Sequence, residues 1–141
     1  MVAEPTRGQL ERALGQRIQT LFRDRVGQRP SRAVCQMFDE SLTIVLEETV
    51  SPPERTLMET GQGALAKQLR SQLNEAMKPA LKSEIAAILD SEVMTVLLDS
   101  DLDSGYSSVT AILQQPPLVR DPQSIPKLRR ERFDSDLPES G

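Results

Sequence analysis

One stretch of the chain decides the fold: Ser51-Pro52-Pro53-Glu54-Arg55-Thr56-Leu57. It predicts the start of a helix, because the Ser51 hydroxyl can cap the N–H groups of the next turn and Glu54 can bond back to the Ser51 N–H. Pro52 suits the first helical position, where its missing N–H costs nothing. Short apolar runs of strand type precede this stretch and a long helical stripe follows it, so it separates two halves of different periodicity.

Upstream, residues 6–26 predict an amphipathic helix. Thr6 and Gln9 can form a second capping box at its start, and Gly27 followed by Pro30 predicts its end. The apolar side chains recur at the spacing of one helical face. They are Leu10, Leu14, Ile18, Leu21 and Phe22.

Downstream, the helix is predicted to span residues 52–78, and Pro79 is expected to kink or break it before a second helical piece. Gly61 and Gly63 weaken a helix, which suggests that another backbone approaches closely there. The stripe that we expect to face the core consists of Leu57, Met58, Gly61, Leu65, Leu69, Leu73, Ala76 and Met77.

Four segments have the character of strands: residues 31–38, 42–48, 92–98 and 106–114. Short polar links join the first pair and the second pair, so each pair is expected to form an antiparallel hairpin. The order α-β-β-α-α-β-β predicts an α+β fold of two layers, with a four-stranded antiparallel sheet and helices on one face. The two links are Asp39-Glu40-Ser41 and residues 99–105.

We expect a single α/β domain over residues 5–117, ended by Pro116-Pro117. Residues 118–141 have few apolar groups and many charges, which predicts a disordered or loosely attached C-terminal tail. One face or edge of so short a sheet would stay exposed, and the faces of the first two strands are half-apolar. A homodimer that covers this surface is the simplest expectation.

The composition argues against several functional classes. A net charge of −4, from 17 basic and 21 acidic residues, disfavours nucleic-acid binding. The chain has no histidine, the commonest general base and zinc ligand, and we see no cofactor motif, so we expect neither enzymatic activity nor a cofactor. The single cysteine, Cys35, excludes an internal disulfide and is expected to be a small buried hydrophobe. No signal pattern or apolar run of about 20 residues is visible, which predicts a cytoplasmic protein without membrane insertion.

Two motifs resemble the MpsC family of small bacterial domains, and the resemblance covers about residues 7–115. The family pattern is a Gly-Lys-Gly-Pro turn followed by a Leu-Thr-Pro-x-Glu helix start. Here the turn reads Gly27-Gln28-Arg29-Pro30, and the helix start reads Val50-Ser51-Pro52-Pro53-Glu54. Arg70 would match an arginine of the family's helix, and Asp99 an acidic position that ends the third strand. The resemblance implies a domain that works beside a sodium-translocating, membrane-potential-generating system.

Four arginines are candidates for an anion site. If the first turn lies near the start of the long helix, an anion could bind at that helix N-terminus. The alternative is a set of surface arginines that are solvated or locally paired. The four are Arg29, Arg32, Arg55 and Arg70.

Three aspartates are candidates for a metal site. Asp99, Asp101 and Asp103 place carboxylates at alternate positions, and calcium prefers such oxygen ligands. An EF-hand loop needs glycine at its sixth position and glutamate at its twelfth, where this chain has Ser104 and Thr110. The alternative is a polar hairpin loop.

The tail contains a possible linear motif for a protein partner. It could fold as a helical turn against that partner, and the alternative is a solvated, inert tail. The residues concerned are Lys127, Arg129, Arg130, Arg132 and Phe133.

These features lead to two functional hypotheses. The first is a non-enzymatic interaction or regulatory module beside a membrane transport or bioenergetic system, held peripherally at the membrane through a protein partner. The alternative is a sensor domain for a small ligand or ion, an anion or Ca²⁺, with the arginines or the aspartates as its site. A thermal shift of several degrees with one ligand would favour the sensor.

Overall fold

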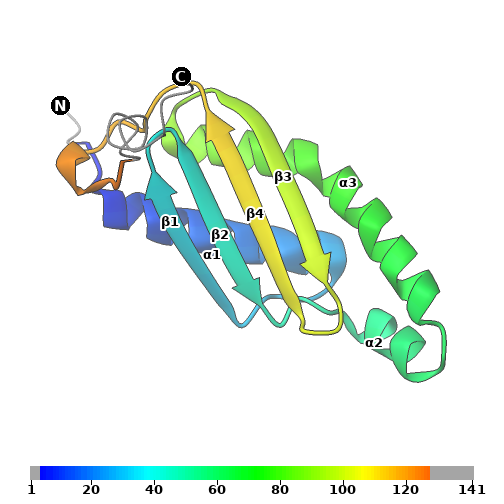
Figure 1. The fold of residues 1–141 in the computed structure, drawn as a ribbon. Helices are drawn as coiled ribbons and strands as arrows, with labels where there is room; N and C mark the ends of the chain where they lie inside the picture. Colours follow the sequence, from blue (N-terminus) through cyan, green and yellow to red (C-terminus); the bar gives the residue numbers. More distant parts are fainter. Residues whose placement is uncertain (1–3, 128–141) are drawn as a thin grey trace, which may run out of the picture.

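The structure of the protein, a computed structural model, describes residues 4–127. An open antiparallel sheet is covered by helices on one face, so the predicted α+β fold is confirmed (Figure 1). In chain order the elements are α1 (Arg7–Val26), β1 (Arg32–Phe38), β2 (Ser41–Glu47), α2 (Pro52–Glu59), α3 (Gly63–Leu89), β3 (Val93–Asp101), β4 (Tyr106–Leu113) and the 3-10 helix η1 (Pro122–Ser124).

The strands lie in the order β1-β2-β4-β3, and each neighbouring pair is antiparallel. The two predicted hairpins are joined in one sheet because β2 pairs with β4, with Ile44 opposite Val109. Figure 1 shows α1 and α3 behind the sheet and α2 beyond its end, close to the turn between β3 and β4. The sheet edges are therefore β1 and β3.

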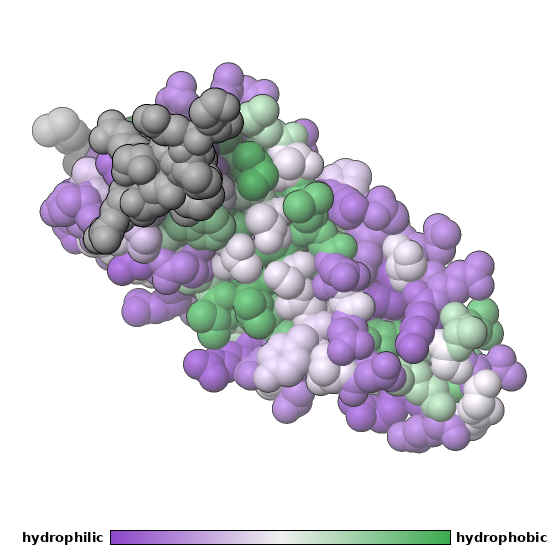
Figure 2. Space-filling model, viewed as in Figure 1, coloured by the Kyte–Doolittle hydropathy of each residue, from purple (hydrophilic) through white to green (hydrophobic). Residues whose placement is uncertain are grey.

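The core lies between the sheet and the two long helices. Leu14, Ile18 and Phe22 of α1 are fully buried against the inward faces of the strands and the second half of α3. On the opposite face of the sheet, Figure 2 shows apolar patches separated by polar side chains. Exposed Val45 and Leu97 belong to this face.

Helix α1 has the predicted ends. Both bonds of the Thr6–Gln9 capping box are present, and Gly27 ends the helix with a φ of 87°. A side chain at Gly15 would place its Cβ 3.4 Å from the Ala33 carbonyl oxygen, so this glycine lets α1 approach β1 closely.

The predicted break at Pro79 is wrong. The chain turns at Gly61, which has a φ of 82° and ends the short helix α2, whereas α3 continues through Pro79. Gly61 adopts the left-handed conformation without the steric cost of a side chain. Pro79 is on the exposed side of α3, where water can reach the backbone carbonyl that proline leaves unbonded. Neither Gly61 nor Gly63 has a neighbouring atom near its missing Cβ, so the expected close approach is absent at both.

The predicted apolar stripe is also displaced in the first half of α3. Leu65 and Leu69 are 50% and 40% exposed, and the adjacent face, with Arg70 and Asn74, is buried instead. The turn at Gly61 resets the helical phase, so the register carried over from Ser51 does not apply to α3. The buried face of α3 consists of Ala66, Arg70, Asn74, Met77, Leu81, Ile85 and Leu89.

The link predicted over residues 99–105 is shorter in the structure. Strand β3 continues to Asp101, and the turn is confined to residues 102–105, with Gly105 at a φ of 83°. Asp99 pairs with Ser108 and Ser100 with Ser107, which holds this acidic stretch in the sheet.

The packed part of the chain extends past residue 117. Val119 and Ile125 are buried in the core, the Arg120 N–H donates to the Pro5 carbonyl, and the Asp39 N–H donates to the Pro126 carbonyl. The structure thus differs from the expected tail over residues 118–127, because two apolar side chains anchor this segment. Residues 128–141 lie outside the described part of the chain.

Candidate functional site

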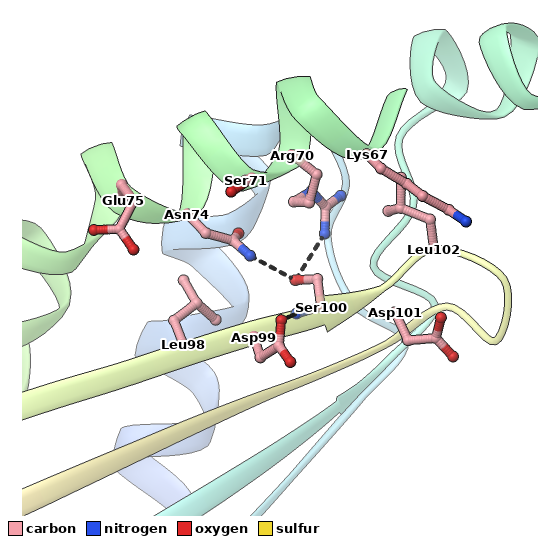
Figure 3. A pocket seen from close by; sticks show the side chains of 10 residues that line it. All are labelled: Lys67, Arg70, Ser71, Asn74, Glu75, Leu98, Asp99, Ser100, Asp101 and Leu102. Carbon is pink, nitrogen blue, oxygen red and sulfur yellow. Dashed lines mark hydrogen bonds between the residues drawn. The ribbon is translucent and has the colours of Figure 1, made fainter. Parts of the chain in front are cut away.

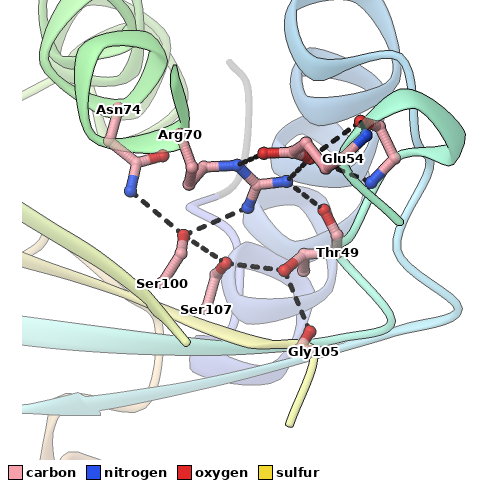
Figure 4. Close-up of polar contacts among 8 residues, drawn as sticks. Thr49, Glu54, Arg70, Asn74, Ser100, Gly105 and Ser107 are labelled. Carbon is pink, nitrogen blue, oxygen red and sulfur yellow. Dashed lines mark hydrogen bonds and ion pairs between the residues drawn. The ribbon is translucent and has the colours of Figure 1, made fainter. Parts of the chain in front are cut away.

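The best-organised polar group is a buried ion pair between α2 and α3. Arg70 is 2% exposed and Glu54 is fully buried. The Arg70 Nε donates to Glu54 Oε2 at 2.9 Å, and Nη2 donates to Glu54 Oε1 at 2.5 Å (Figure 4). Nη2 also donates to the carbonyl oxygen of Thr49. This bidentate geometry satisfies the carboxylate in a buried site, where an unpaired charge would be costly.

Glu54 has two roles at once. Its Oε1 accepts from the Ser51 N–H at 3.0 Å, as the capping box predicts, and also from the Ser51 hydroxyl at 2.8 Å. The same carboxylate binds Arg70, so the residue that starts α2 also fastens it to α3. A small apolar cluster supports this joint: Val50, Ala66 and Leu102, with Leu57 and Met58 against them.

A chain of hydroxyl groups continues from Arg70 into the sheet (Figure 4). The Thr49 hydroxyl donates to the Gly105 carbonyl at 2.9 Å, so it accepts from Ser107 at 2.8 Å. Ser107 must then accept from Ser100 at 2.6 Å. Ser100 has thereby used its only hydrogen, and it accepts from Arg70 Nη1 at 3.2 Å. The donor and the acceptor of each hydrogen bond between these three hydroxyl groups are thus assigned.

This direction fixes the orientation of Asn74. Because Ser100 has only lone pairs left, Asn74 turns its Nδ2 toward it, at 3.1 Å. The Asn74 Oδ1 is buried and has no hydrogen-bond partner among residues 4–127. A buried acceptor without a donor costs about 1–3 kcal/mol, so a donor from outside would stabilise it.

Beside Asn74, α3 and the end of β3 enclose a polar cavity of about 410 Å³ (Figure 3). We call this cavity the α3–β3 groove. Asn74 and Ser100 come together within it, and charged residues line it on both sides. These are Lys67, Arg70 and Glu75 from α3 and Asp99 and Asp101 from β3.

The charges of the groove are only partly paired. Lys67 lies 3.7 Å from Asp103, and Glu75 lies 2.7 Å from Lys78. A hydrogen bond from Ser104 lowers the pKa of the exposed Asp101 carboxyl below its usual value. Two carboxylates of the groove, those of Asp99 and Asp101, form no salt bridge within the described part of the chain.

The four arginines of the predicted anion site do not form one solvent-facing cluster. Arg70 is buried and bound to Glu54, whereas Arg29, Arg32 and Arg55 are exposed. Arg29 donates to the Thr20 hydroxyl at 3.3 Å. Only the three exposed arginines are available to a dissolved anion, and their role as a site stays a hypothesis.

The three aspartates of the predicted metal site are divided between two elements. Asp99 and Asp101 lie on β3, and Asp103 lies in the turn that follows. The Asp99 Oδ1 accepts from the Ser100 N–H at 3.0 Å. Over residues 4–127, no three carboxylate or thiol side chains gather in a way that could hold a metal ion.

Two further sequence predictions concern Cys35 and the tail. Cys35 is partly buried against the core, and this burial, together with the negative charge of Glu11, raises the pKa of its thiol to about 12. Lys127 is exposed. The other residues of the predicted linear motif lie outside the described residues: Arg129, Arg130, Arg132 and Phe133.

Sequence reasoning singled out Glu54 and Arg70 separately but did not pair them, and it missed the groove. A signal for the burial of Arg70 was present. Counting back from Leu81 on α3 in steps of three or four residues reaches Met77, Asn74 and Arg70 on the buried face. Polar residues at buried positions of a helix predict a polar partner nearby, although not which one.

Comparisons with known proteins agree with the motifs. A family model described as "Na+-translocating membrane potential-generating system (MpsC)" matches residues 6–115. No curated protein and no solved structure matches the chain. Of the helices between residues 4 and 127, none has the length and apolar character needed to cross a bilayer.

Proposed function

Since the chain belongs to the MpsC family, we propose that it is a non-enzymatic interaction or regulatory module of a membrane transport or bioenergetic system. The family description, which names a Na⁺-translocating system that generates membrane potential, supports the setting. The module works in the cytoplasm and reaches the membrane through a protein partner.

The proposal of a non-enzymatic role is supported by the hydrogen bonds of the Arg70–Glu54 pair, which are all made within the protein. Arg70 donates to Glu54, Thr49 and Ser100, and Glu54 accepts in addition from Ser51. These internal hydrogen bonds connect α2 to α3, so the pair stabilises the surface that the two helices form. A rigid surface with this support is what a docking module needs.

The experiment is co-purification of the tagged full chain from detergent-solubilised membranes of the cell that encodes it. We expect an integral membrane transport protein to be enriched over a control in which an unrelated tagged protein of similar charge is used. Absence of an enriched membrane protein, or turnover of a substrate by the purified chain, would contradict the proposal.

A second candidate function, a small-ligand or ion sensor, is favoured by one observation: the unpartnered Asn74 Oδ1 beside the α3–β3 groove. Thermal shift measurements with calcium, phosphate, bicarbonate and nucleotides test it. A shift of several degrees with a single ligand would favour the sensor. No shift, together with a co-purifying membrane protein, would favour the interaction module.

A further inference from the structure

The two edges of the sheet differ in how their backbone groups are used. On β1, the Met37 N–H donates to Glu11 Oε2 at 2.9 Å, and the Met37 carbonyl accepts from the Gln36 side chain at 2.7 Å. Gly15 of α1 lies against the carbonyl of Ala33 on the same strand. Side chains and a helix therefore block β1 against the addition of another strand.

On β3, the alternation of the ladder shows which backbone groups point outward. In the β2–β4–β3 part of the sheet, the Gln114 N–H donates to Glu92 on the β3 side, whereas the Leu113 N–H donates to Glu40 on the β2 side. The backbone groups of even-numbered β4 residues thus form hydrogen bonds with β3. Thr110 pairs with Leu97, and Ser108 pairs with Asp99. The intervening residues of β3 direct their backbone groups away from the sheet. They are Val96, Leu98 and Ser100, and the last has its N–H held by Asp99.

Helix α3 makes this open edge into a groove. Figure 1 shows α3 running along the outside of β3 in the helix layer, and Figure 3 shows the α3–β3 groove at the end of that edge. A second copy that offered its own β3 would bring a second α3 into the same space. A single extended segment avoids that conflict, because it can lie over α3 and beside β3.

The charges indicate what this segment carries. Asp99 and Asp101 lie at alternate positions of β3, so their side chains share the outer face of the sheet. The cations of the groove are engaged elsewhere, Lys67 near Asp103 and Arg70 with Glu54. Between the two aspartates, Ser100 faces α3 and adjoins Asn74, whose Oδ1 lacks a donor.

We infer that the β3 edge and the α3–β3 groove bind an extended segment of a partner protein as a fifth strand. Its backbone pairs with Val96 and Leu98, basic side chains lie opposite Asp99 and Asp101, and a small polar side chain between them lies opposite Ser100. The inference rests on the proposed function as an interaction module and names the surface and the chemistry of the partner.

The test uses the ¹⁵N-labelled full chain and the peptide acetyl-Thr-Arg-Ser-Arg-Thr-Val-Thr-amide, aligned antiparallel so that its arginines oppose Asp101 and Asp99. The matched control peptide has glutamate in place of both arginines. With the arginine peptide at millimolar concentration, we expect shifts and slowed hydrogen exchange at the Val96 and Leu98 amides. With the glutamate peptide we expect neither. Equal binding of both peptides, no binding, or changes centred on β1 would overturn the inference.

Variants distinguish binding at the α3–β3 groove from a general attraction between the basic peptide and the acidic protein. Asp99→Asn with Asp101→Asn keeps the local hydrogen-bond acceptors and removes both charges, so peptide affinity should fall about fivefold or more. Glu59→Gln removes an exposed carboxylate of α2 that does not line the groove, and it should leave affinity unchanged. An equal effect of Glu59→Gln would refute the site. If the peptide does not bind but a membrane protein still co-purifies with the full chain, the strand-addition site is wrong and the proposed function stands.

Discussion

Replacing Arg70 with methionine tests how much the buried pair contributes to stability. Methionine fills much of the same space but leaves the Glu54 carboxylate buried without a cation and the Thr49 carbonyl without its donor. Removing one partner of a buried ion pair costs about 3–5 kcal/mol. With a urea m-value of about 2 kcal/mol/M, the unfolding midpoint should fall by about 1.5–2.5 M. Circular dichroism measures the transition, since the chain has no tryptophan.

Controls show whether the loss belongs to the pair. Arg55→Met removes an exposed arginine next to Glu54 and should change the free energy of unfolding by no more than about 0.5 kcal/mol. If Arg70→Met does not fold, Arg70→Lys serves in its place. It keeps the charge but loses the bidentate geometry, so it should lower the free energy of unfolding by an intermediate amount. Glu54→Gln combined with Arg70→Met should cost less than the sum of the single changes. A loss below about 1 kcal/mol for Arg70→Met would refute the reasoning.

Four further predictions follow from single positions. Thr49→Val interrupts the hydroxyl chain and leaves Ser107 without its acceptor, so thermal unfolding should show a loss of about 1–3 kcal/mol, and no change would contradict the assigned direction. Gly61→Ala places a Cβ at a φ of 82° and should lower stability by about 1–2 kcal/mol in the same assay, whereas a stabilised variant would mean that the turn tolerates side chains. Cys35, with a pKa of about 12, stays a neutral thiol at pH 8, so iodoacetamide should label it only after denaturation, and rapid native labelling would refute this. Val45→Glu should reduce the dimer fraction in light scattering if a second copy covers the open sheet face, and a monomeric unmodified chain would exclude that dimer.

Local sequence signals predicted most of the fold. The capping boxes at Thr6 and Ser51 gave correct starts for α1 and α2, because each depends on residues only three positions apart. The alternation of β2 and β4 gave correct strands, because one face of each is buried. The predicted end of the long helix was wrong. Pro79 is a strong local signal for a helix end, but it lies on the exposed side of α3 and does not interrupt the helix. The chain turns at Gly61 instead, where the backbone adopts a left-handed conformation.

The candidate site was much less predictable. The arginines and aspartates were grouped by type and position in the chain, and such grouping does not show which side chains point inward. Arg70 was counted with three surface arginines, although the phase of α3 buries it against Glu54. The periodicity of the chain predicts that Asp99 lies in a loop, whereas the family resemblance predicts that it ends the third strand, and its pairing with Ser108 does place it on the edge strand β3.

The order of amino acids was sufficient for the helix starts, the strand alternation and the pairing within each hairpin, because these depend on interactions between residues close together in the chain. The packing of α3 against β3 decided the rest. It brought Arg70 to Glu54 across 16 positions and to Ser100 across 30, and it formed the groove beside an edge at which Val96 and Leu98 direct their backbone groups away from β4. Such contacts depend on the rotation of one helix about its axis, and that rotation is set by how the whole core fills its volume.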